Sequence, residues 1–244
     1  MHQKVFDHLM SLKQELVQNC IHCKGLGCIH CSREFDLYEQ IAHSGIPMKY
    51  WNLDLKDIDP KAQGLKEIKN YLSKLKEAYK EGKGIFAYGK NGNGKTLCAC
   101  AIGKEAIRQG FTVRYTFLGE VISCFVDSMY NQELRDQIKQ DILGVDFLIL
   151  DDIDKTFISE NSKYVNSILD SIFRQRVQSN LPVIMTANKT MNDILNSGEE
   201  VFSKSLLSLF DESLLPVMFM GADRRAEIKK DAIKRFLKDE KEKE

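Results

Sequence analysis

One stretch of the sequence limits the possible folds more than any other: GKNGNGKT at residues 89–96. It fits the pattern G-x-x-x-x-G-K-[ST]. An apolar run, GIFAYG at 84–89, precedes it, and a helical pattern over 95–109 follows it. Glycines let a backbone curl around a phosphate with its N–H groups pointing inward, and a helix that follows adds the positive end of its dipole. The stretch therefore predicts a phosphate-binding loop between a strand and a helix.

The positions of this loop have separate expected roles. Lys95 would reach the β- and γ-phosphates of a nucleotide, and Thr96 would place its hydroxyl on Mg²⁺. Asn91 and Asn93 tolerate the left-handed conformations that such a loop needs. The simpler alternative is a glycine-rich turn with a solvated lysine, which the flanking strand and helix disfavour. The expected nucleotide-binding residues are Gly89, Asn91, Gly92, Asn93, Gly94, Lys95, Thr96 and Leu97.

From residue 84 onward, short apolar runs alternate with helical patterns. The apolar runs are GIFAYG (84–89), TVRYTF (112–117), DFLILD (146–151), LPVIMTA (181–187) and LPVMFMG (215–221). The helical patterns occupy 95–109, 119–143, 162–179, 199–210 and 223–239. Such alternation predicts an α/β fold, in which helices cover both faces of a mostly parallel sheet.

Polar side chains follow two of the predicted strands. In FLILDDID, Asp151 and Asp152 come directly after four apolar residues, at the end of a strand where parallel sheets bind ligands. We assign Asp151 to Mg²⁺, through water, and Asp152 to the attacking water, which it would orient or deprotonate. Asn188 follows the strand at 181–187 and would lie between that water and the γ-phosphate. The alternatives are an aspartate-rich turn and an asparagine that caps a helix.

Before residue 84, the chain carries a cysteine cluster. Apolar stripes predict helices over 4–17 and 34–44, and CIHCKGLGCIHC lies between them. Two Cys-x-x-Cys hooks are a usual way to present four thiolates to zinc, and Gly25 and Gly27 let the chain turn tightly. The expected zinc ligands are Cys20, Cys23, Cys28 and Cys31. The alternatives are idle reduced thiols, or a thiolate replaced by His22 or His30. Cys98, Cys100 and Cys124 are expected in the core.

Composition excludes some classes of protein. The chain has 244 residues, of which 43% are hydrophobic, and its formal net charge is zero. Contact with nucleic acid must then come from a local patch. The sequence contains no apolar run long enough to span a membrane, and the first residues, MHQKVFDHLMSLKQE, lack the apolar centre of a signal peptide. We therefore expect a cytoplasmic protein without a membrane partner.

These motifs resemble those of AAA+ ATPases, and more narrowly those of the DnaC/DnaI-type replicative helicase loaders and their IstB-like transposition relatives. The segment IPMKYWNLDLKDID is similar to the one that introduces the loaders' ATPase core, VQSNLPVIMTAN resembles their strand before sensor 1, and LPVMFMGADRR resembles the end of their core. The resemblance covers roughly residues 46–237. It implies an AAA+ P-loop fold, ATPase activity, and ATP and Mg²⁺ as cofactors.

Within that family, Asn188 would be sensor 1, and Arg224, or else Arg225, would be a nucleotide-binding sensor 2; solvated arginines are the alternative. One departure concerns the arginine finger, which AAA+ proteins usually carry on the helix before the last core strand. That helix, EEVFSKSLLSLFDES, has no arginine, and Lys204 is its only cation. Arg174 and Arg176, one element earlier, would face a neighbour or the solvent. Either another basic residue acts in trans, or hydrolysis is weak and ATP serves mainly as an assembly switch.

The resemblance divides the chain into residues 1–45, a helical zinc module for partner docking; 46–83, a linker and a lysine-rich helix over 61–82; 84–239, the AAA+ core; and 240–244, a charged tail. It implies a helicase loader that binds single-stranded DNA, docks on a DnaB-type helicase and self-associates when ATP is bound. The stretch at 119–143 would contact DNA, unless its aromatic side chains are core. The side chains of this stretch considered for DNA contact are Phe125, Met129, Tyr130 and Arg135, and none of them is singled out. Alternatives are an IstB-type transposition regulator, a nucleotide-gated adaptor with little turnover, or a zinc knuckle that touches DNA.

Overall fold

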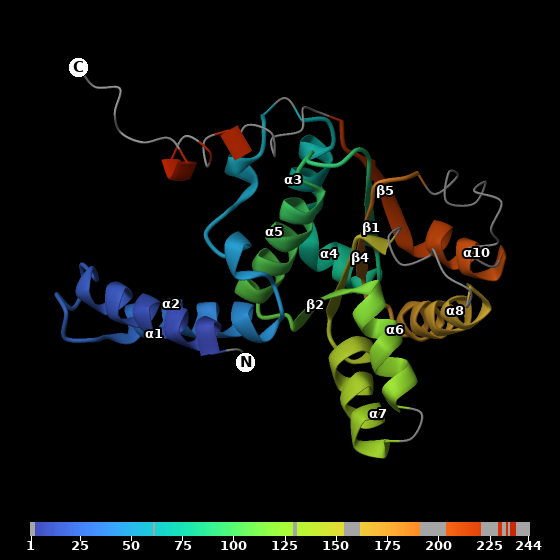
Figure 1. The fold of residues 1–244 in the computed structure, drawn as a ribbon, viewed down its shortest axis with the longest axis horizontal. Helices are drawn as coiled ribbons and strands as arrows, with labels where there is room; N and C mark the ends of the chain where they lie inside the picture. Colours follow the sequence, from blue (N-terminus) through green and yellow to red (C-terminus); the bar gives the residue numbers. More distant parts are fainter. Residues whose placement is uncertain are drawn as a thin grey trace.

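In the computed structural model, the predicted alternation forms one parallel sheet with helices on both faces (Figure 1). The structure describes residues 3–60, 62–128, 131–153, 162–190 and 204–220, together with 229, 230, 233 and 235–237. The strands are β1 Gly84–Tyr88, β2 Val113–Phe117, β3 Phe147–Asp151, β4 Val183–Ala187 and β5 Leu214–Met218. Their order is β2-β3-β4-β1-β5, and every neighbouring pair is parallel. The predicted α/β fold is confirmed.

Helices precede the first strand and connect successive strands along the sequence. The described α-helices are α1 Gln3–Gln18, α2 Ile29–His43, α3 Leu65–Ser73, α4 Leu75–Lys80, α5 Lys95–Arg108, α6 Leu118–Asp127, α7 Gln132–Ile138, α8 Ser162–Gln178 and α10 Lys204–Ser213. Shorter turns are η1 Met48–Tyr50, η2 Leu55–Asp57 and η4 Lys139–Leu143. Among the described residues, none of the helices combines the length and the apolar character needed to cross a bilayer.

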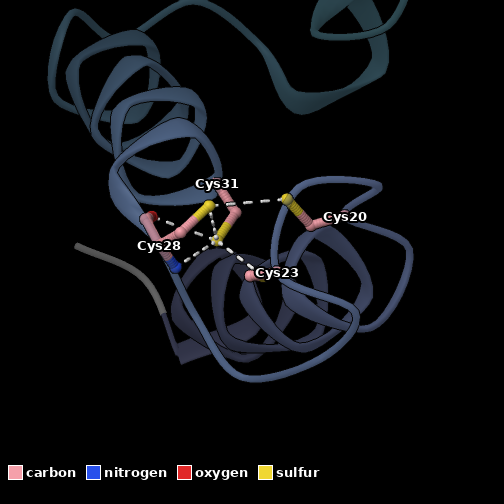
Figure 2. Close-up of side chains that lie close together, drawn as sticks. All are labelled: Cys20, Cys23, Cys28 and Cys31. Atoms are coloured by element: carbon pink, nitrogen blue, oxygen red, sulfur yellow. Dashed lines mark hydrogen bonds between the residues drawn. The ribbon is translucent and has the colours of Figure 1, made fainter.

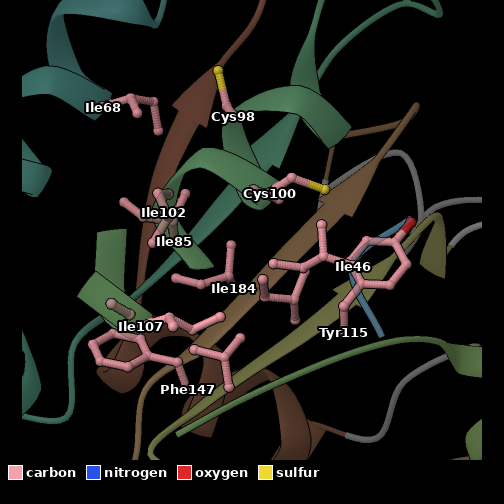
Figure 3. Close-up of a cluster of buried hydrophobic side chains, with 14 of the residues drawn as sticks. Ile46, Ile68, Ile85, Cys98, Cys100, Ile102, Ile107, Tyr115, Phe147 and Ile184 are labelled. Atoms are coloured by element: carbon pink, nitrogen blue, oxygen red, sulfur yellow. The ribbon is translucent and has the colours of Figure 1, made fainter. Parts of the chain in front are cut away.

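Two apolar layers cover the sheet, and the strand residues alternate between them. Ile85 and Ile149 face the layer that contains α5, whereas Phe86 and Leu150 face the layer that contains α8 and α10. This is the period of two expected for a strand, and burial of both faces explains why the strands read as continuous apolar runs. Figure 3 shows the first layer, where Ile102 of α5 is part of the cluster on the sheet.

Several expected element boundaries were wrong. The lysine-rich pattern at 61–82 forms two helices rather than one, because Lys74 between α3 and α4 has non-helical angles of φ −118° and ψ 23°. The pattern at 119–143 is also divided, since Asn131 caps a new helix by accepting a hydrogen bond from the Leu134 N–H. Helix α2 begins at Ile29 instead of residue 34, so Cys31 lies inside it. The described residues within the pattern at 223–239 are helical.

The three cysteines outside the cluster differ in burial. Cys98 and Cys100 lie on α5 within the apolar layer, as predicted (Figure 3). Burial raises the pKa of Cys98 to about 12 and also raises that of Cys100, so both remain neutral packing groups. The expectation for Cys124 was wrong, because its side chain is exposed on α6. A moderately apolar helix face was insufficient to predict burial there.

Helices α1 and α2 pack against each other as an antiparallel pair, with residues 19–28 forming the turn between them. We call this unit, Gln3 to His43, the N-terminal hairpin. It buries Leu9, Leu12 and Phe35, and the base of α2 contacts α5 of the sheet domain. In Figure 1 the hairpin lies beside α5, and its turn points away from the sheet. The cysteine cluster is therefore carried on an arm of the sheet domain.

Residues 44–58, which we call the connector, join this hairpin to the remainder of the chain. Lys104 of α5 has 0% of its surface exposed, and it binds the connector backbone. Its ammonium group donates hydrogen bonds to the carbonyls of Tyr50 (2.9 Å), Trp51 (3.1 Å) and Leu53, with an Asp54 carboxylate oxygen 3.7 Å away. Burial lowers the pKa of Lys104, and these acceptors compensate for its lost hydration. Lys104 thus fixes the connector on α5.

The two edges of the sheet are protected in different ways. At the β2 edge, the Tyr115 N–H donates to the Ser44 carbonyl at 2.7 Å, so the connector pairs with the strand. At the β5 edge, Pro216 lies opposite Phe86. The Phe219 N–H donates to the Tyr88 carbonyl, so the backbone groups of Phe219 and of every second residue before it face β1. Pro216 belongs to the other set, and its backbone nitrogen therefore points outward, away from the sheet.

We predict that Lys104→Met lowers the free energy of unfolding by about 3 kcal/mol, because the substitution keeps the apolar stem but leaves buried carbonyls without a donor. Chemical denaturation of the full chain measures this change. Lys76→Met removes an exposed lysine of α4 and serves as the control, with an expected change within about 0.5 kcal/mol. Equal stability of the two variants would contradict the role given to Lys104.

Candidate nucleotide-binding site and cysteine cluster

The loop at 89–96 has the geometry of a phosphate cradle. Strand β1 ends at Tyr88 and helix α5 begins at Lys95. Gly89, Gly92 and Gly94 have φ values of 137°, 80° and 92°, in the region that favours glycine. A Cβ atom on Gly89 would lie 2.1 Å from the Phe219 carbonyl oxygen. Gly89 is therefore required by both conformation and space, and Gly92 and Gly94 are required by conformation.

The asparagines of the loop do not have the role expected for them. The described non-glycine residues with positive φ do not include Asn91 or Asn93, so the left-handed positions belong to the glycines alone. Asn93 is instead a brace, because its side chain is buried and its Nδ2 donates to the Phe219 carbonyl at 3.1 Å. Leu97 is half-buried in the first turn of α5 and packs against the apolar layer.

The Lys95 ammonium group lies inside the loop. It donates to the carbonyls of Gly89 (2.7 Å) and Lys90 (2.8 Å) and to Asn188 Oδ1 (3.2 Å). Asn188 follows β4, so this contact joins two strands that are adjacent in the sheet. Only 6% of the Lys95 surface is exposed. The predicted loop lysine and the predicted sensor asparagine are thus in direct contact.

Three hydroxyl groups surround the carboxylate of Asp151. Thr96 Oγ1 donates to its Oδ1 at 3.1 Å, and Thr186 donates to the same oxygen. Tyr115 donates to Oδ2 at 2.6 Å. Burial and the Asp151 carboxylate raise the pKa of Tyr115, which keeps its hydroxyl protonated and able to donate. The predicted pair Thr96 and Asp151 is brought together, although 55 positions separate the two residues in the sequence.

The oxygen donors of this pair fit a magnesium ion. Hydroxyl and carboxylate oxygens are the ligands that Mg²⁺ takes in nucleotide sites, usually with several waters. Thr96 and Asp151 would hold the ion, which neutralises phosphate charge when bound. Next to them, Asp152 has a φ of 53°, and its N–H donates to Thr186 Oγ1 at 2.9 Å. With this left-handed backbone conformation, the chain leaves the extended path of β3 at Asp152.

Sequence reasoning missed Tyr115 and Thr186. Both were counted as strand residues within apolar runs, and neither belongs to the loop pattern or the aspartate pair. Thr186 is fully buried and Tyr115 is 5% exposed. A hydroxyl on an inward position near the carboxyl end of a strand was the available signal, because buried polar groups need partners. The sequence did not reveal which strands would be neighbours.

The candidate arginines fall into three cases. Arg224 and Arg225 lie outside the described residues. Arg176, expected at a neighbour or in solvent, is instead fully buried on α8. It donates to the carbonyls of Ile142 (2.9 Å), Leu143 (3.4 Å), Asp146 (3.0 Å) and Pro182 (2.9 Å). Arg176 is therefore a structural residue and cannot reach the active site of a neighbouring copy. Arg174 is exposed and pairs with Asp170 one helical turn away.

The DNA-contact candidates are also only partly placed. Met129 and Tyr130 lie outside the described residues. Phe125 is half-buried and packs against the apolar layer on the α8 side. Arg135 is exposed on α7, and its Nη2 donates to the Ser128 carbonyl at 3.2 Å. Among the described candidates, Arg135 is the one with the exposure that a phosphate contact requires.

The four cysteines of the N-terminal hairpin converge at its turn, as Figure 2 shows. Their sulfur atoms all lie within 4.8 Å of one another, and no other group of metal-ligating side chains was found among the described residues. The S···S distances are 3.6 Å for Cys20–Cys28, 3.9 Å for Cys23–Cys31 and 3.9 Å for Cys28–Cys31. A tetrahedral zinc ion with bonds of about 2.3 Å requires S···S distances of about 3.8 Å. The cluster can therefore hold a metal ion.

Hydrogen bonds and burial shift the pKa values of two of these cysteines in opposite directions. The Cys31 N–H lowers the pKa of Cys28 to about 7, whereas burial and Cys20 raise the pKa of Cys23. Gly25 and Gly27 have φ values of 92° and 82°, so they provide the tight turn that was expected of them. His22 and His30 stack on each other with ring centroids 4.0 Å apart. The four-cysteine set is the one that the structure brings together.

Comparison with known proteins places this geometry in a family. A family model described as IstB-like ATP binding protein matches residues 51–208. The replicative helicase loader DnaC of Escherichia coli strain K12 is 27% identical over 182 residues, covering 72% of each chain. The loader DnaI of Bacillus subtilis strain 168 is 24% identical, covering 65% of this chain and 52% of DnaI. An IS21-like ATP-binding protein of Bacteroides fragilis is 27% identical, covering 64% and 57%.

Solved structures show the same fold. The structure of the DnaC helicase loader has a TM-score of 0.60 at 20% identity, covering 71% of this chain and 100% of that one. The structure of DnaI has a TM-score of 0.59 at 21% identity, covering 71% and 94%. The segment matched by the family model contains the loop at 89–96, Asp151 and Asn188, and it is more than half of the chain. The chain therefore belongs to the IstB-like ATP-binding protein family of AAA+ ATPases, which it shares with the DnaC/DnaI-type helicase loaders.

Proposed function

We propose that this protein is an ATP-dependent loader of a replicative helicase. It binds ATP with Mg²⁺ and single-stranded DNA, and it holds a DnaB-type helicase through the N-terminal hairpin. The observation that carries this proposal is the combination of two units in one chain: a nucleotide site built from the loop, Asp151 and Asn188, and a cysteine-bearing arm outside the family match at 51–208. This role is carried out in the cytoplasm.

The proposed nucleotide site assigns one task to each polar residue. The loop N–H groups and Lys95, whose ammonium group lies inside the loop, bind the phosphates. Thr96 and Asp151 hold Mg²⁺, and Asp152 orients the attacking water. Asn188, already 3.2 Å from Lys95, senses the terminal phosphate. Arg224 remains the proposed sensor 2.

The proposed docking surface surrounds the zinc site. Zinc on Cys20, Cys23, Cys28 and Cys31 would order the turn of the hairpin, which has few buried apolar side chains of its own. Large aliphatic side chains are exposed at this turn: Ile21 is 84% exposed, Leu26 is 91% exposed and Ile29 is 61% exposed. An exposed apolar group of this kind is typical of a protein-binding surface. The helicase is the proposed partner.

Hydrolysis is proposed to be slow in the isolated protein. The helix before β5 has no arginine, and the buried Arg176 is committed to backbone carbonyls. Because neither this helix nor Arg176 supplies a planar cation to a neighbouring site, transition-state charge would be less well stabilised. ATP then acts chiefly as a switch that promotes self-association and changes the grip on the helicase or on DNA. At the extreme of slow hydrolysis, the protein would be a nucleotide-gated adaptor whose ATP turnover is not stimulated by DNA.

A second candidate function is regulation of transposition. The observation that favours it is the similarity to the IS21-like ATP-binding protein of Bacteroides fragilis, at the same 27% identity as DnaC. In that role the ATPase would assemble on duplex DNA and recruit a transposase. The cysteine cluster on the arm favours the helicase, because it adds a docking unit outside the matched segment.

Lys95→Ala should weaken ATP binding about 100-fold, equivalent to about 2.7 kcal/mol, because it removes the charged donor from the phosphate cradle. Isothermal titration of the full chain with ATP and Mg²⁺ measures the effect. Lys90→Ala, an exposed lysine at a variable position of the same loop, is the matched control and should bind normally. Zinc content should stay at one ion per chain. Normal binding by Lys95→Ala would rule out the loop assignment.

Cys23→Ser should reduce zinc content well below one ion per chain and abolish capture of a purified hexameric helicase, while ATP binding is retained. The expected separation follows because the cysteines lie on the turn of the N-terminal hairpin, whereas the nucleotide loop lies between β1 and α5. Cys124→Ser removes an exposed thiol outside the cluster and should change neither property. Capture of a transposase and not of the helicase by the full-length protein would support the second function.

Single-stranded DNA should stimulate ATP turnover several-fold if the protein is a DNA-dependent loader. Phosphate release, measured with and without an oligonucleotide, tests this. Arg135→Ala should lower the stimulation, because Arg135 is an exposed cation on α7, whereas Lys76→Ala on α4 should not. Turnover that does not respond to DNA in the wild-type protein would favour the passive adaptor.

A further inference from the structure

Tyr115 belongs to none of the sequence motifs, yet it contacts the centre of the nucleotide site. Strand β2 pairs with β3 in a register that places Phe117 beside Asp151 and Tyr115 beside Ile149. The side chain of Tyr115 runs along this strand pair toward the carboxyl edge of the sheet, and its hydroxyl reaches Asp151 Oδ2 at 2.6 Å. Of the three hydroxyl groups that donate to Asp151, Tyr115 is the one that binds Oδ2. Tyr115 therefore fixes the half of the carboxylate that Thr96 and Thr186 do not.

The backbone of the same residue contacts the connector. The Tyr115 N–H donates to the Ser44 carbonyl at 2.7 Å. At the next position, Gly45 has a φ of 82°, and a Cβ atom built there would lie 2.7 Å from the Tyr115 carbonyl oxygen. The chain can approach β2 this closely only because the residue is glycine. One amino acid thus touches both Asp151 and the first residues of the connector.

The rest of the connector is firmly held after this contact. Ile46 packs in the same apolar layer as Tyr115 (Figure 3), and its carbonyl accepts a hydrogen bond from Trp51 Nε1 at 2.8 Å. Lys104 then binds the backbone of Tyr50 and Trp51 to α5. Helix α5 begins with Lys95 and Thr96 of the nucleotide site. A shift of Tyr115 or of α5 would therefore move the packed connector directly, because no loop lies between them.

We propose that Tyr115 is a positioning residue of the nucleotide site, which orients Asp151 for magnesium and couples the state of that site to the connector and the N-terminal hairpin. This inference rests on the proposed ATP-binding function and adds to it a route by which the nucleotide reaches the docking arm. Groups that orient a metal ligand commonly change metal affinity 10- to 100-fold when they are removed. The hydroxyl of Tyr115 occupies such a position.

Tyr115→Phe tests the first part of the proposal, because it removes the hydroxyl and keeps the buried ring. The measurement is the binding of a fluorescent, non-hydrolysable ATP analogue as Mg²⁺ is titrated, and again in excess chelator. We expect the Mg²⁺ concentration for half-maximal binding to rise about 10-fold. The affinity in chelator should be unchanged, a pattern that a general loss of structure would not produce.

Tyr79→Phe is the matched control. Tyr79 donates to Asp146 Oδ1 at 2.6 Å, so this variant also removes a tyrosine–aspartate hydrogen bond, but at a place that contacts none of the nucleotide-site residues. Its Mg²⁺ requirement should equal that of the wild type. An equal increase in both variants would mean that the effect comes from stability, and it would overturn the role given to Tyr115.

Trp51 reports the coupling directly, because it is the single tryptophan of the chain and lies buried in the connector. Its emission should change when the wild-type protein binds the analogue with saturating Mg²⁺, and Tyr79→Phe should behave in the same way. Tyr115→Phe should lose most of this change even when fully loaded. Gly45→Ala, which pushes the connector away from β2, should lose it too while keeping a normal Mg²⁺ requirement.

The outcomes separate this inference from the proposed function. If Tyr115→Phe shows a wild-type Mg²⁺ requirement and a wild-type Trp51 response, the coupling is wrong although ATP binding stands. If Gly45→Ala keeps the full response, the contact with Ser44 and Gly45 is not the route. If the wild-type protein fails to bind the analogue at all, the proposed function and this inference fall together.

Discussion

Parallel pairing of three central strands is the constraint on which the nucleotide site depends. β1 and β3 both pair with β4, in registers that set Ala87 beside Thr186 and Leu150 beside Met185. Their carboxyl ends are therefore level, and each end continues into a chemically useful residue. The loop follows β1, Asp151 ends β3 and Asn188 follows β4. Residues that are up to 93 positions apart in the sequence reach hydrogen-bonding distance only because these strands keep their register.

Two buried cations, Lys104 and Arg176, brace the fold internally. Lys104 binds the connector to α5, and Arg176 joins the start of β3 to the segment before β4 through backbone carbonyls. Burying such groups is costly unless hydrogen bonds replace their hydration, and both have several acceptors. Each cation connects chain segments that are not otherwise linked by a shared helix or strand. The connector and the carboxyl end of α8 are consequently held against the sheet domain by hydrogen bonds to buried side chains.

Local patterns were sufficient to predict the sheet, the loop and the Thr96–Asp151 pair. The loop pattern, the aspartates after an apolar run and the spacing of the four cysteines are each short enough to recognise without knowledge of the fold. What could not be predicted was set by neighbours distant in the sequence. Tyr115 joins the site only because β2 lies beside β3, and Arg176 reads like a solvated helix residue until its acceptors are placed around it. The helix breaks near Lys74 and Asn131 were also hidden, since the apolar spacing continues across them.

The two protected edges of the sheet limit how copies of this protein can meet. At one side the connector occupies the backbone groups of β2 at Tyr115, and at the other Pro216 presents no N–H to an arriving strand. Among the described residues, main-chain pairing with another molecule is therefore disfavoured at both edges. A contact between copies of this chain at these edges would rest on side chains more than on main-chain pairing, and side-chain contacts are the easier kind to reverse.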